Sequence, residues 1–428
     1  MGGQTAEEPK QARLALGSVR RLAGQAAIDL GPLRRHRDFR LLWLGLTASY
    51  FGRMVESVAV PFQIYRLTHS TLAVGLLELF AFFPLVTLGL VGGAFADAHD
   101  RRRIVLLSEA GFGLAAALLL VNSLLPHPQL LPIYGLELVA SSFYALQRPS
   151  LDSLMPRLVD RNEQTAAAAL NNLRFNATAI GGPAVAGIVI AGFGLPAAFG
   201  IYVGMFLLSL VAIVAMRASP PPTGAERPSL RRIREGLDYA RGRPDLLGTY
   251  LVDMAAMFFG MPIALFPAVA DRLGGPAVLG VLTAAPAAGS LLISIGSGWT
   301  RHVHRHGRAI VLAAGAWGLA VIGFGLAPSL AIAVVFLALA GAGDTISGVF
   351  RSTIWNQTIP DRLRGRLAGI ELISYTSGPT LGNFEAGAVA AAFGLRFSIV
   401  SGGVLCVVST IACAVFLRGF WVYDDRPG

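Results

Sequence analysis

Blocks of about 20 largely apolar residues recur along the whole sequence, separated by prolines, glycines or groups of arginines. A helix that crosses the hydrocarbon core of a bilayer needs about 20 such residues. Inside a bilayer only helices and closed barrels satisfy the hydrogen bonds of the backbone. The blocks therefore predict an all-α integral membrane protein with about twelve spans, at residues 41–65, 72–96, 104–123, 130–150, 164–190, 195–216, 245–270, 276–298, 309–327, 330–352, 366–391 and 396–418.

The composition also indicates a membrane protein. Hydrophobic residues make up 54% of the 428 residues and charged residues only 14%, whereas soluble proteins carry about 25% charged residues. The net charge of +10 comes almost wholly from arginines scattered between apolar blocks, because Lys10 is the sole lysine. Charge dispersed in this way favours a role in membrane topology. We therefore expect the lipid bilayer as a partner and no nucleic acid.

The arginines occupy every second loop. One set of loops holds the N-terminal arginines through Arg40 and those at 101–103, 157–161, 217–243, 301–308, 362–366 and 418–426. The other set holds only Arg66, Arg272 and Arg396. The positive-inside rule then predicts that the first set of loops and both termini lie in the cytoplasm. The first forty residues also lack the apolar core of a secretory signal.

The sequence divides near its middle and repeats. Residues 217–244 are polar and proline-rich and are predicted to be a cytoplasmic linker. It joins two six-helix halves, 41–216 and 245–418, flanked by a cytoplasmic N-terminal segment, 1–40, and a tail, 419–428. The halves share short matches in the same order, such as AGFGLPAAF at 191–199 and AAFGLRFSI at 391–399. These matches predict a parallel repeat about an axis along the membrane normal.

Two motifs make the chain similar to a known family. Gly93, Asp97, Arg101 and Arg103 follow the order G-x-x-x-D-x-x-x-R-x-R between the second and third predicted spans. This order resembles the signature of the major facilitator superfamily. The stretch VPFQIYRLTHSTLAVGL at 60–76 resembles, more narrowly, the first external loop of the enterobactin exporter family. The corresponding loop of the second half, 296–311, lacks the aspartate, so any gating inference depends on the first copy.

The resemblance implies a major facilitator fold in the plasma (inner) membrane of a bacterium, and secondary active transport without an enzymatic reaction. It implies proton-coupled export of an enterobactin-like siderophore or another amphiphilic small molecule. Multidrug or macrolide efflux is the alternative within the transporter class. An integral-membrane enzyme is the alternative from another class, but no nucleophile–base or metal-spaced constellation supports it. No phosphate-binding G-x-x-x-x-G-K-[ST] motif is present, which excludes that type of ATP-driven pump.

Several ionisable residues fall inside the predicted spans. An embedded charge costs on the order of 2.5–3.5 kcal/mol, so it normally faces a cavity or a partner. Glu56 and Asp253 occupy corresponding depths in the first spans of the two halves. Since burial favours a neutral carboxyl that binds and releases a proton, we hypothesise that one or both carry the coupling proton. Arg53 lies three residues before Glu56, and an internal ion pair between them remains an open alternative.

Other polar residues are predicted to line the substrate cavity. They are Arg53, Glu78, Glu137, Asn171, Arg174, Asn176 and Glu385. Arg174 and its neighbouring amides would bind an anionic or oxygen-rich substrate, although hydrogen bonding between helices is an equally open interpretation. His302, His304 and His306 alternate in a basic loop without a carboxylate or cysteine nearby. We therefore expect no metal and no cofactor, and a monomer suffices for transport.

Two further groups of residues are assigned by resemblance. The gating residues are Gly93, Asp97, Arg101, Arg103, Asp361, Arg364 and Arg366. Asp97 is expected to bond or cap the start of span 11 near Arg366, because a carboxylate is favoured at a helix N-terminus. Gly182-Pro183 and Gly378-Pro379 lie within the fifth span of each half. Either they bend these helices between states or they form static packing notches.

Overall fold

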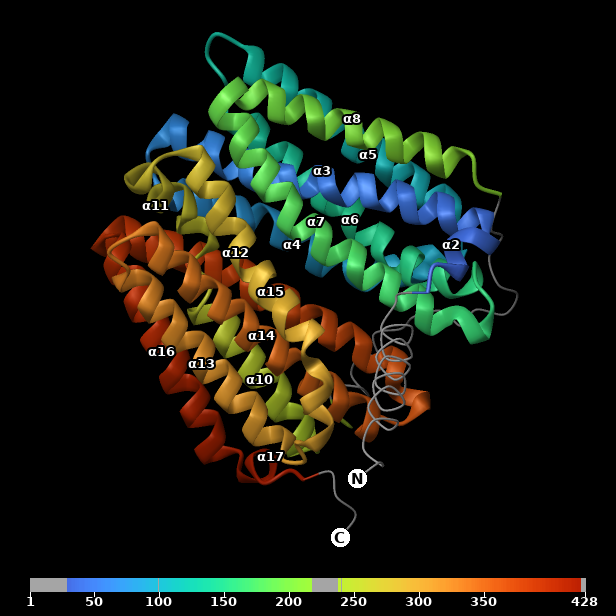
Figure 1. Ribbon diagram of the computed structural model, residues 1–428, viewed down its shortest axis with the longest axis vertical. Helices are drawn as coiled ribbons and strands as arrows, with labels where there is room; N and C mark the ends of the chain where they lie inside the picture. The colour runs from blue at the N-terminus through green and yellow to red at the C-terminus, as the bar shows by residue number, and fades with distance from the viewer. Residues whose placement is uncertain (1–28, 99, 218–237, 240, 425–428) are drawn as a thin grey trace, which may run out of the picture.

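The computed structural model describes residues 29–98, 100–217, 238–239 and 241–424 (Figure 1). For residues 90–98, 153 and 361–374 it describes the backbone alone. Every regular element within this part of the chain is helical. The predicted linker therefore lies largely outside the described residues.

The first half of the chain forms the N-terminal helix group. Its long helices are α3 (Arg37–Thr68), α4 (Thr71–Ala98), α5 (Arg101–Leu124), α6 (Leu130–Leu154), α7 (Gln164–Phe193) and α8 (Leu195–Val214). Short helices precede α3 or join α6 to α7, namely α2 (Gly31–Arg35), η1 (Met155–Arg157) and η2 (Arg161–Glu163). In this group α3 packs against α7 and α8, while α6 packs against α4 and α5.

The second half forms the C-terminal helix group. Its long helices are α10 (Pro244–Phe259), α12 (Pro276–Ile295), α13 (His306–Leu326), α14 (Leu330–Thr358), α15 (Asp361–Phe393) and α16 (Leu395–Phe416). The shorter ones are η3 (Ile263–Leu265), α11 (Phe266–Leu273), η4 (Ser297–His302) and α17 (Arg418–Trp421). Here α13 packs against α14 and α16, and α10 packs against α15 and α16.

The predicted spans agree with the observed helical segments, and the seventh segment contains an interruption that the sequence did not indicate. Nine helices of the described chain are long and apolar enough to cross a membrane. The long helices α3, α6 and α15 complete the expected twelve, counting α10 and α11 as one span. The predicted span 245–270 corresponds to the apolar segment Pro244–Leu273, but its helix is interrupted between Phe259 and Phe266. The freed backbone groups find partners there: Trp317 Nε1 donates to the Gly260 carbonyl at 3.0 Å, and Asn383 Oδ1 accepts from Ala264 N–H at 3.0 Å.

The repeated sequence Phe-Gly-Leu has a conformational reason. Gly194 between α7 and α8 has φ 82° and ψ 175°, and Gly394 between α15 and α16 has φ 94° and ψ 156°. Residues with a Cβ essentially never adopt this combination. Glycine is therefore required at both corners, and each half turns from its fifth long helix into its sixth in the same way.

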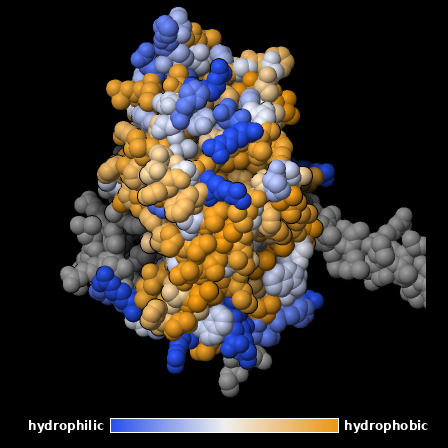
Figure 2. Space-filling model, turned by 90° about the vertical axis from the view of Figure 1, so that its left-hand side faces the viewer, coloured by the Kyte–Doolittle hydropathy of each residue, from blue (hydrophilic) through white to orange (hydrophobic). Residues whose placement is uncertain are grey.

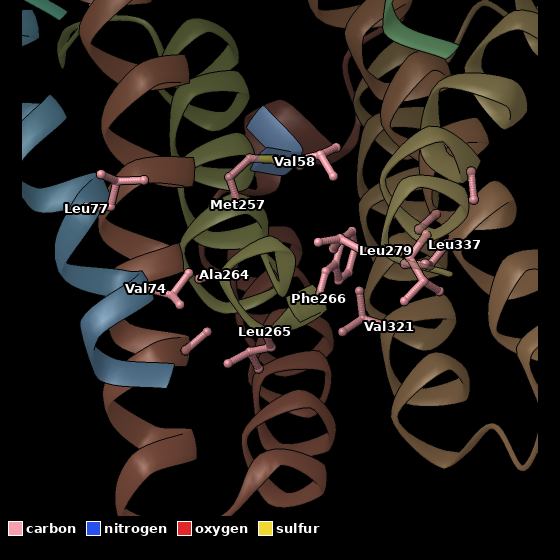
Figure 3. Close-up of a cluster of buried hydrophobic side chains, with 14 of the residues drawn as sticks. Val58, Val74, Leu77, Met257, Ala264, Leu265, Phe266, Leu279, Val321 and Leu337 are labelled. Atoms are coloured by element: carbon pink, nitrogen blue, oxygen red, sulfur yellow. The ribbon is translucent and has the colours of Figure 1, made fainter. Parts of the chain in front are cut away.

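The two helix groups meet at one end of the molecule. We call the end that carries Arg101 and Arg305 the arginine-rich end, and the opposite end the arginine-poor end. Contacts between the groups run mainly through α4 with α15 and α7 with α12. Thr71 Oγ1 donates to the Gly387 carbonyl at 3.0 Å, where α4 begins and α15 approaches its own end. Val58, Val74 and Leu77 of the N-terminal group share one apolar cluster with Leu265 and Phe266 (Figure 3).

Pairs of glycines allow the closest of these approaches. A Cβ on Gly187 of α7 would lie 2.9 Å from Gly280 Cα of α12, and a Cβ on Gly387 of α15 would lie 3.1 Å from Gly75 Cα of α4. Figure 1 shows the two groups close together beside α11 and diverging towards α2 and α17. The arginine-poor end is thus closed by direct helix packing.

Candidate functional site

A polar cluster lies within the N-terminal helix group, contributed by three different helices. Arg53 and Glu56 belong to α3, Glu78 to α4 and Glu137 to α6, and all four side chains are half-buried. Glu137 lies within electrostatic range of both Glu56 and Glu78. Ser141 Oγ donates to Glu137 Oε1 at 2.9 Å. The structure therefore brings together four of the residues predicted to line the cavity or carry a proton.

Arg53 is held mainly by aromatic rings. Its guanidinium carbon lies 4.3 Å from the ring centroid of Tyr144 and 5.2 Å from that of Phe112. Among the described residues no ion pair joins Arg53 to Glu56. The side chain of Glu56 lies close to that of Tyr202. The internal ion pair is therefore absent from this conformation. The cation over two aromatic faces is stabilised by the ring quadrupoles.

A fifth ionisable residue near this cluster, Glu109, was not anticipated. Its side chain in α5 is fully buried. Glu109 Oε1 accepts from Ser49 Oγ at 3.0 Å and from Gln147 Nε2 at 2.7 Å, which links α5 to α3 and α6. An acidic residue inside an apolar run was the signal that should have identified it, since such residues normally have a partner or a function.

Asp253 has a different environment from that of Glu56. It is buried in α10 and forms an ion pair with Arg351 of α14. Arg351 Nη2 also lies 3.6 Å from Asp344 Oδ1, two helical turns earlier on α14. Arg351 was missed because it lies at the edge of a predicted span, where it resembled a loop arginine. The spacing of seven residues from Asp344 was the available signal, because it places both side chains on one helix face.

Arg174, Asn171 and Asn176, which were predicted to bind the substrate together, each contact a different partner in the structure. Arg174 Nη1 donates to the Leu46 carbonyl of α3 at 3.0 Å. Asn171 Nδ2 contacts Met155 Sδ at 2.9 Å, and Asn176 Nδ2 donates to a carbonyl of its own helix at 2.9 Å. In this conformation Arg174 connects helices, as the second interpretation proposed.

Glu385 and the two glycine–proline pairs lie on the fifth long helices. Glu385 is half-buried in α15, and within the described chain it has no ion-pair partner. Gly182 of α7 faces Met54 of α3, while a Cβ on Gly378 of α15 would lie 3.0 Å from Met257 Cβ of α10. Pro183 and Pro379 stay inside continuous helices. Each pair therefore occupies an equivalent close contact within its own helix group.

The predicted gate is only partly described. The side chains of Gly93, Asp97, Asp361, Arg364 and Arg366 lie outside the described residues. Arg101 begins α5 and is buried, and Arg103 is exposed. Asp100 caps α5, because its carboxylate accepts from the backbone N–H of Arg102 at 2.9 Å. The carboxylate that caps α5 therefore belongs to Asp100, three positions after Asp97.

Ion pairs at the arginine-rich end join segments within one helix group. Glu163, in the loop before α7, accepts from Arg35 Nη1 at 2.8 Å and lies 2.5 Å from His36 Nε2. Arg243, just before α10, donates to Asp245 at 2.6 Å. This hydrogen bond raises the pKa of the Arg243 guanidinium. The Glu163 contacts connect the segment before α3 to the segment before α7, whereas the Arg243–Asp245 pair is local to the start of α10.

Comparison with known proteins agrees with this architecture. A family model described as transmembrane secretion effector matches residues 27–420. The chain is 29% identical over 356 residues to the enterobactin exporter EntS of Shigella boydii serotype 18. The matched region covers 83% of this chain and 86% of that protein. EntS of Escherichia coli O1:K1 matches with the same identity and coverage.

A solved structure has the same fold at low identity. A bacterial homologue of the human lysosomal transporter Spinster, in an inward-facing and unoccupied conformation, superposes with a TM-score of 0.69 at 16% identity, over 92% of this chain and 99% of that chain. At this identity the likeness supports the fold alone. Because the family model spans nearly the whole chain, the resemblance is confirmed: the chain belongs to the transmembrane secretion effector family and is a transporter of the major facilitator superfamily.

Proposed function

We propose that this chain is a proton-coupled exporter of a siderophore of the enterobactin type or another amphiphilic small molecule. The observation that carries the proposal is the convergence of Glu56, Glu78 and Glu137 from three helices near Arg53. Carboxylates that share a poorly solvated site do not all ionise together, so the group exchanges protons as a unit. The export direction and the siderophore come from the similarity to EntS.

The aromatic residues around Arg53 support an amphiphilic substrate. Tyr144 and Phe112 flank its guanidinium, and Tyr50 lies beside Arg174. Rings next to an arginine bind a ligand that combines flat apolar surface with oxygen atoms or negative charge. Proton binding to the neighbouring carboxylates would make the cluster more positive and so alter its affinity for such a ligand.

The closed end fits one stage of an export cycle. We place the arginine-rich end in the cytoplasm by the positive-inside rule. The glycine contacts then close the external side, and a molecule from the cytoplasm would enter between the diverging groups. Outward opening would separate Gly187 from Gly280 and Gly387 from Gly75, while the loops bearing Asp97 and Arg366 would close the inner side.

Glu56→Gln and Glu137→Gln test the proton site. Glutamine keeps the size of glutamate but cannot exchange a proton, so we expect efflux in each variant to fall to the rate that the wild type shows without a proton gradient. The assay measures efflux of a catecholate siderophore and, in parallel, of lipophilic cations. Asp271→Asn, at an exposed position of α11, is the control.

The outcomes separate the candidate functions. Full gradient-driven efflux in both glutamine variants would refute the proton site. Efflux of lipophilic cations without efflux of the siderophore would replace siderophore export by multidrug efflux. If the glutamine variants still bind the substrate but no longer export it, the defect lies in the coupling of transport to the proton gradient.

The proposed inner gate has its own test. If Asp97 bonds the start of α15 in the outward-open state, Asp97→Asn should favour the conformation in which the arginine-rich end is open. Labelling of cysteines introduced at the arginine-rich ends of the two helix groups should then rise, because loss of a charge-assisted hydrogen bond of about 1.5–3 kcal/mol shifts the ratio of the two conformations roughly ten- to 150-fold. Unchanged labelling would show that Asp97 does not act in this gate.

A further inference from the structure

A groove of about 500 Å³ lies between α13 and α16. Its lining includes Val311, Leu312 and Gly315 of α13, Val407 and Ile411 of α16, and Trp421 of α17. Both long helices pack within the C-terminal group, away from the N-terminal group. Leu312 is 66% exposed and Ile411 55% exposed, so the groove opens on the outer surface of the bundle. It is therefore separate from the polar cluster around Arg53.

The medium at this surface is lipid. Figure 2 shows the face formed by the lower part of the bundle as a broad apolar area with hydrophilic residues along its lower edge. A hollow in such a face is filled by whatever apolar chain the membrane supplies. Gly315 helps to create the hollow, since a Cβ there would meet only Thr410 Oγ1, at 4.0 Å.

One end of the groove carries a cation that has no acidic partner among the described residues. The guanidinium carbon of Arg308 lies 5.4 Å from the ring centroid of Trp421, which lines the groove. Arg308 Nε is buried and, within the described chain, has no hydrogen-bond partner. Its neighbour Arg305 instead lies 3.9 Å from Asp424. Arg308 precedes Leu312 by one helical turn, so the charge lies at the arginine-rich end of the groove.

We infer that this groove binds an anionic phospholipid, with an acyl chain against Gly315 and the headgroup phosphate at Arg308. Three observations match that ligand: an apolar hollow of about 500 Å³, an aromatic ring in its lining, and a guanidinium beside the ring that has no ion-pair partner among the described residues. Tryptophan and arginine have these positions at membrane interfaces, where the ring contacts the glycerol region and the cation contacts phosphate. Lipid bound at this site would contact both α13 and α16, so the packing of these helices would depend on the lipid composition of the membrane.

Lipid titration of the purified full-length protein, followed by native mass spectrometry, tests the site. We expect the wild type to bind phosphatidylglycerol about fivefold more tightly than phosphatidylcholine of the same chain length, the usual effect of one arginine near a lipid headgroup. Arg308→Gln should remove this preference and Arg308→Lys should largely keep it. Gly315→Leu fills the groove and should weaken binding of both lipids.

Two control variants make the result specific. Gly204→Leu places the same side chain on α8, where a Cβ would meet nothing within 4 Å, and Arg157→Gln removes an exposed arginine from the other helix group. Both should bind lipid like the wild type. Retained phosphatidylglycerol preference in Arg308→Gln would overturn the headgroup assignment. Unchanged binding in Gly315→Leu would overturn the groove itself.

Discussion

Replacing Gly187 by alanine is expected to open the arginine-poor end of the molecule. A Cβ at this position would lie 2.8 Å from the Pro276 carbonyl oxygen and 2.9 Å from Gly280 Cα, both backbone atoms of α12. Overpacking of this kind costs about 1–3 kcal/mol. If only the closed conformation bears this cost, its population relative to the open one falls roughly 5- to 150-fold.

The distance between spin labels at His127 and Ser329, on exposed loops of the two helix groups, reports this change. We expect the distribution to shift to longer distances in Gly187→Ala. Gly387→Ala should have the same effect, because a Cβ there would lie 2.6 Å from the Thr71 carbonyl oxygen. Gly192→Ala is the matched control, because Gly192 lies on the same helix as Gly187 and a Cβ there would meet no atom within 4 Å. Unchanged distances in both test variants would show that these crossings do not hold the end closed.

Removing either partner of the Asp253–Arg351 pair is expected to destabilise the C-terminal helix group strongly. Both side chains are buried, so Asp253→Asn removes the closest described acid from a buried guanidinium and leaves Asp344 Oδ1 at 3.6 Å. Loss of one partner from a buried ion pair costs about 3–5 kcal/mol, whereas loss of both costs much less. In thermal unfolding, Asp253→Asn and Arg351→Gln should each lower Tm by several degrees, and the double variant should recover most of the loss.

This cycle also separates two roles for Asp253. If the ion pair is structural, stability falls in the single variants and the double variant transports. If Asp253 carries a coupling proton, the double variant regains stability but remains uncoupled. Single variants as stable as the wild type would contradict the structural contribution of the pair. Asp344→Asn, whose side chain is 43% exposed, should have a smaller effect than either.

The architecture was predictable because the bilayer imposes long apolar helices. Only the break in the seventh span was missed, since hydropathy continues through Gly260 and Pro262 while the backbone groups there bond to Trp317 and Asn383. These partners lie far away in the sequence. The repeat was visible at Gly194 and Gly394 because a backbone conformation restricted to glycine is conserved between the halves of one chain.

The candidate site was predictable in its residue types and less so in its pairings. Glu56, Glu78 and Glu137 stand out as acids in apolar runs, and the structure gathers them on three helices. The partners of Arg53 are aromatic rings, which no spacing rule indicates. Arg351 became visible as the partner of Asp253 only once α14 was packed beside α10. The packing of the helices determines which embedded charges form pairs, and the local sequence does not predict this packing.

Transport into inside-out membrane vesicles tests the central claim of proton-coupled export most directly. With an acidic lumen, the account predicts accumulation of a catecholate siderophore. This accumulation should collapse on addition of a protonophore, and it should be equally low in Glu56→Gln or Glu137→Gln without the protonophore. Accumulation that persists with the protonophore and in both variants would contradict the account.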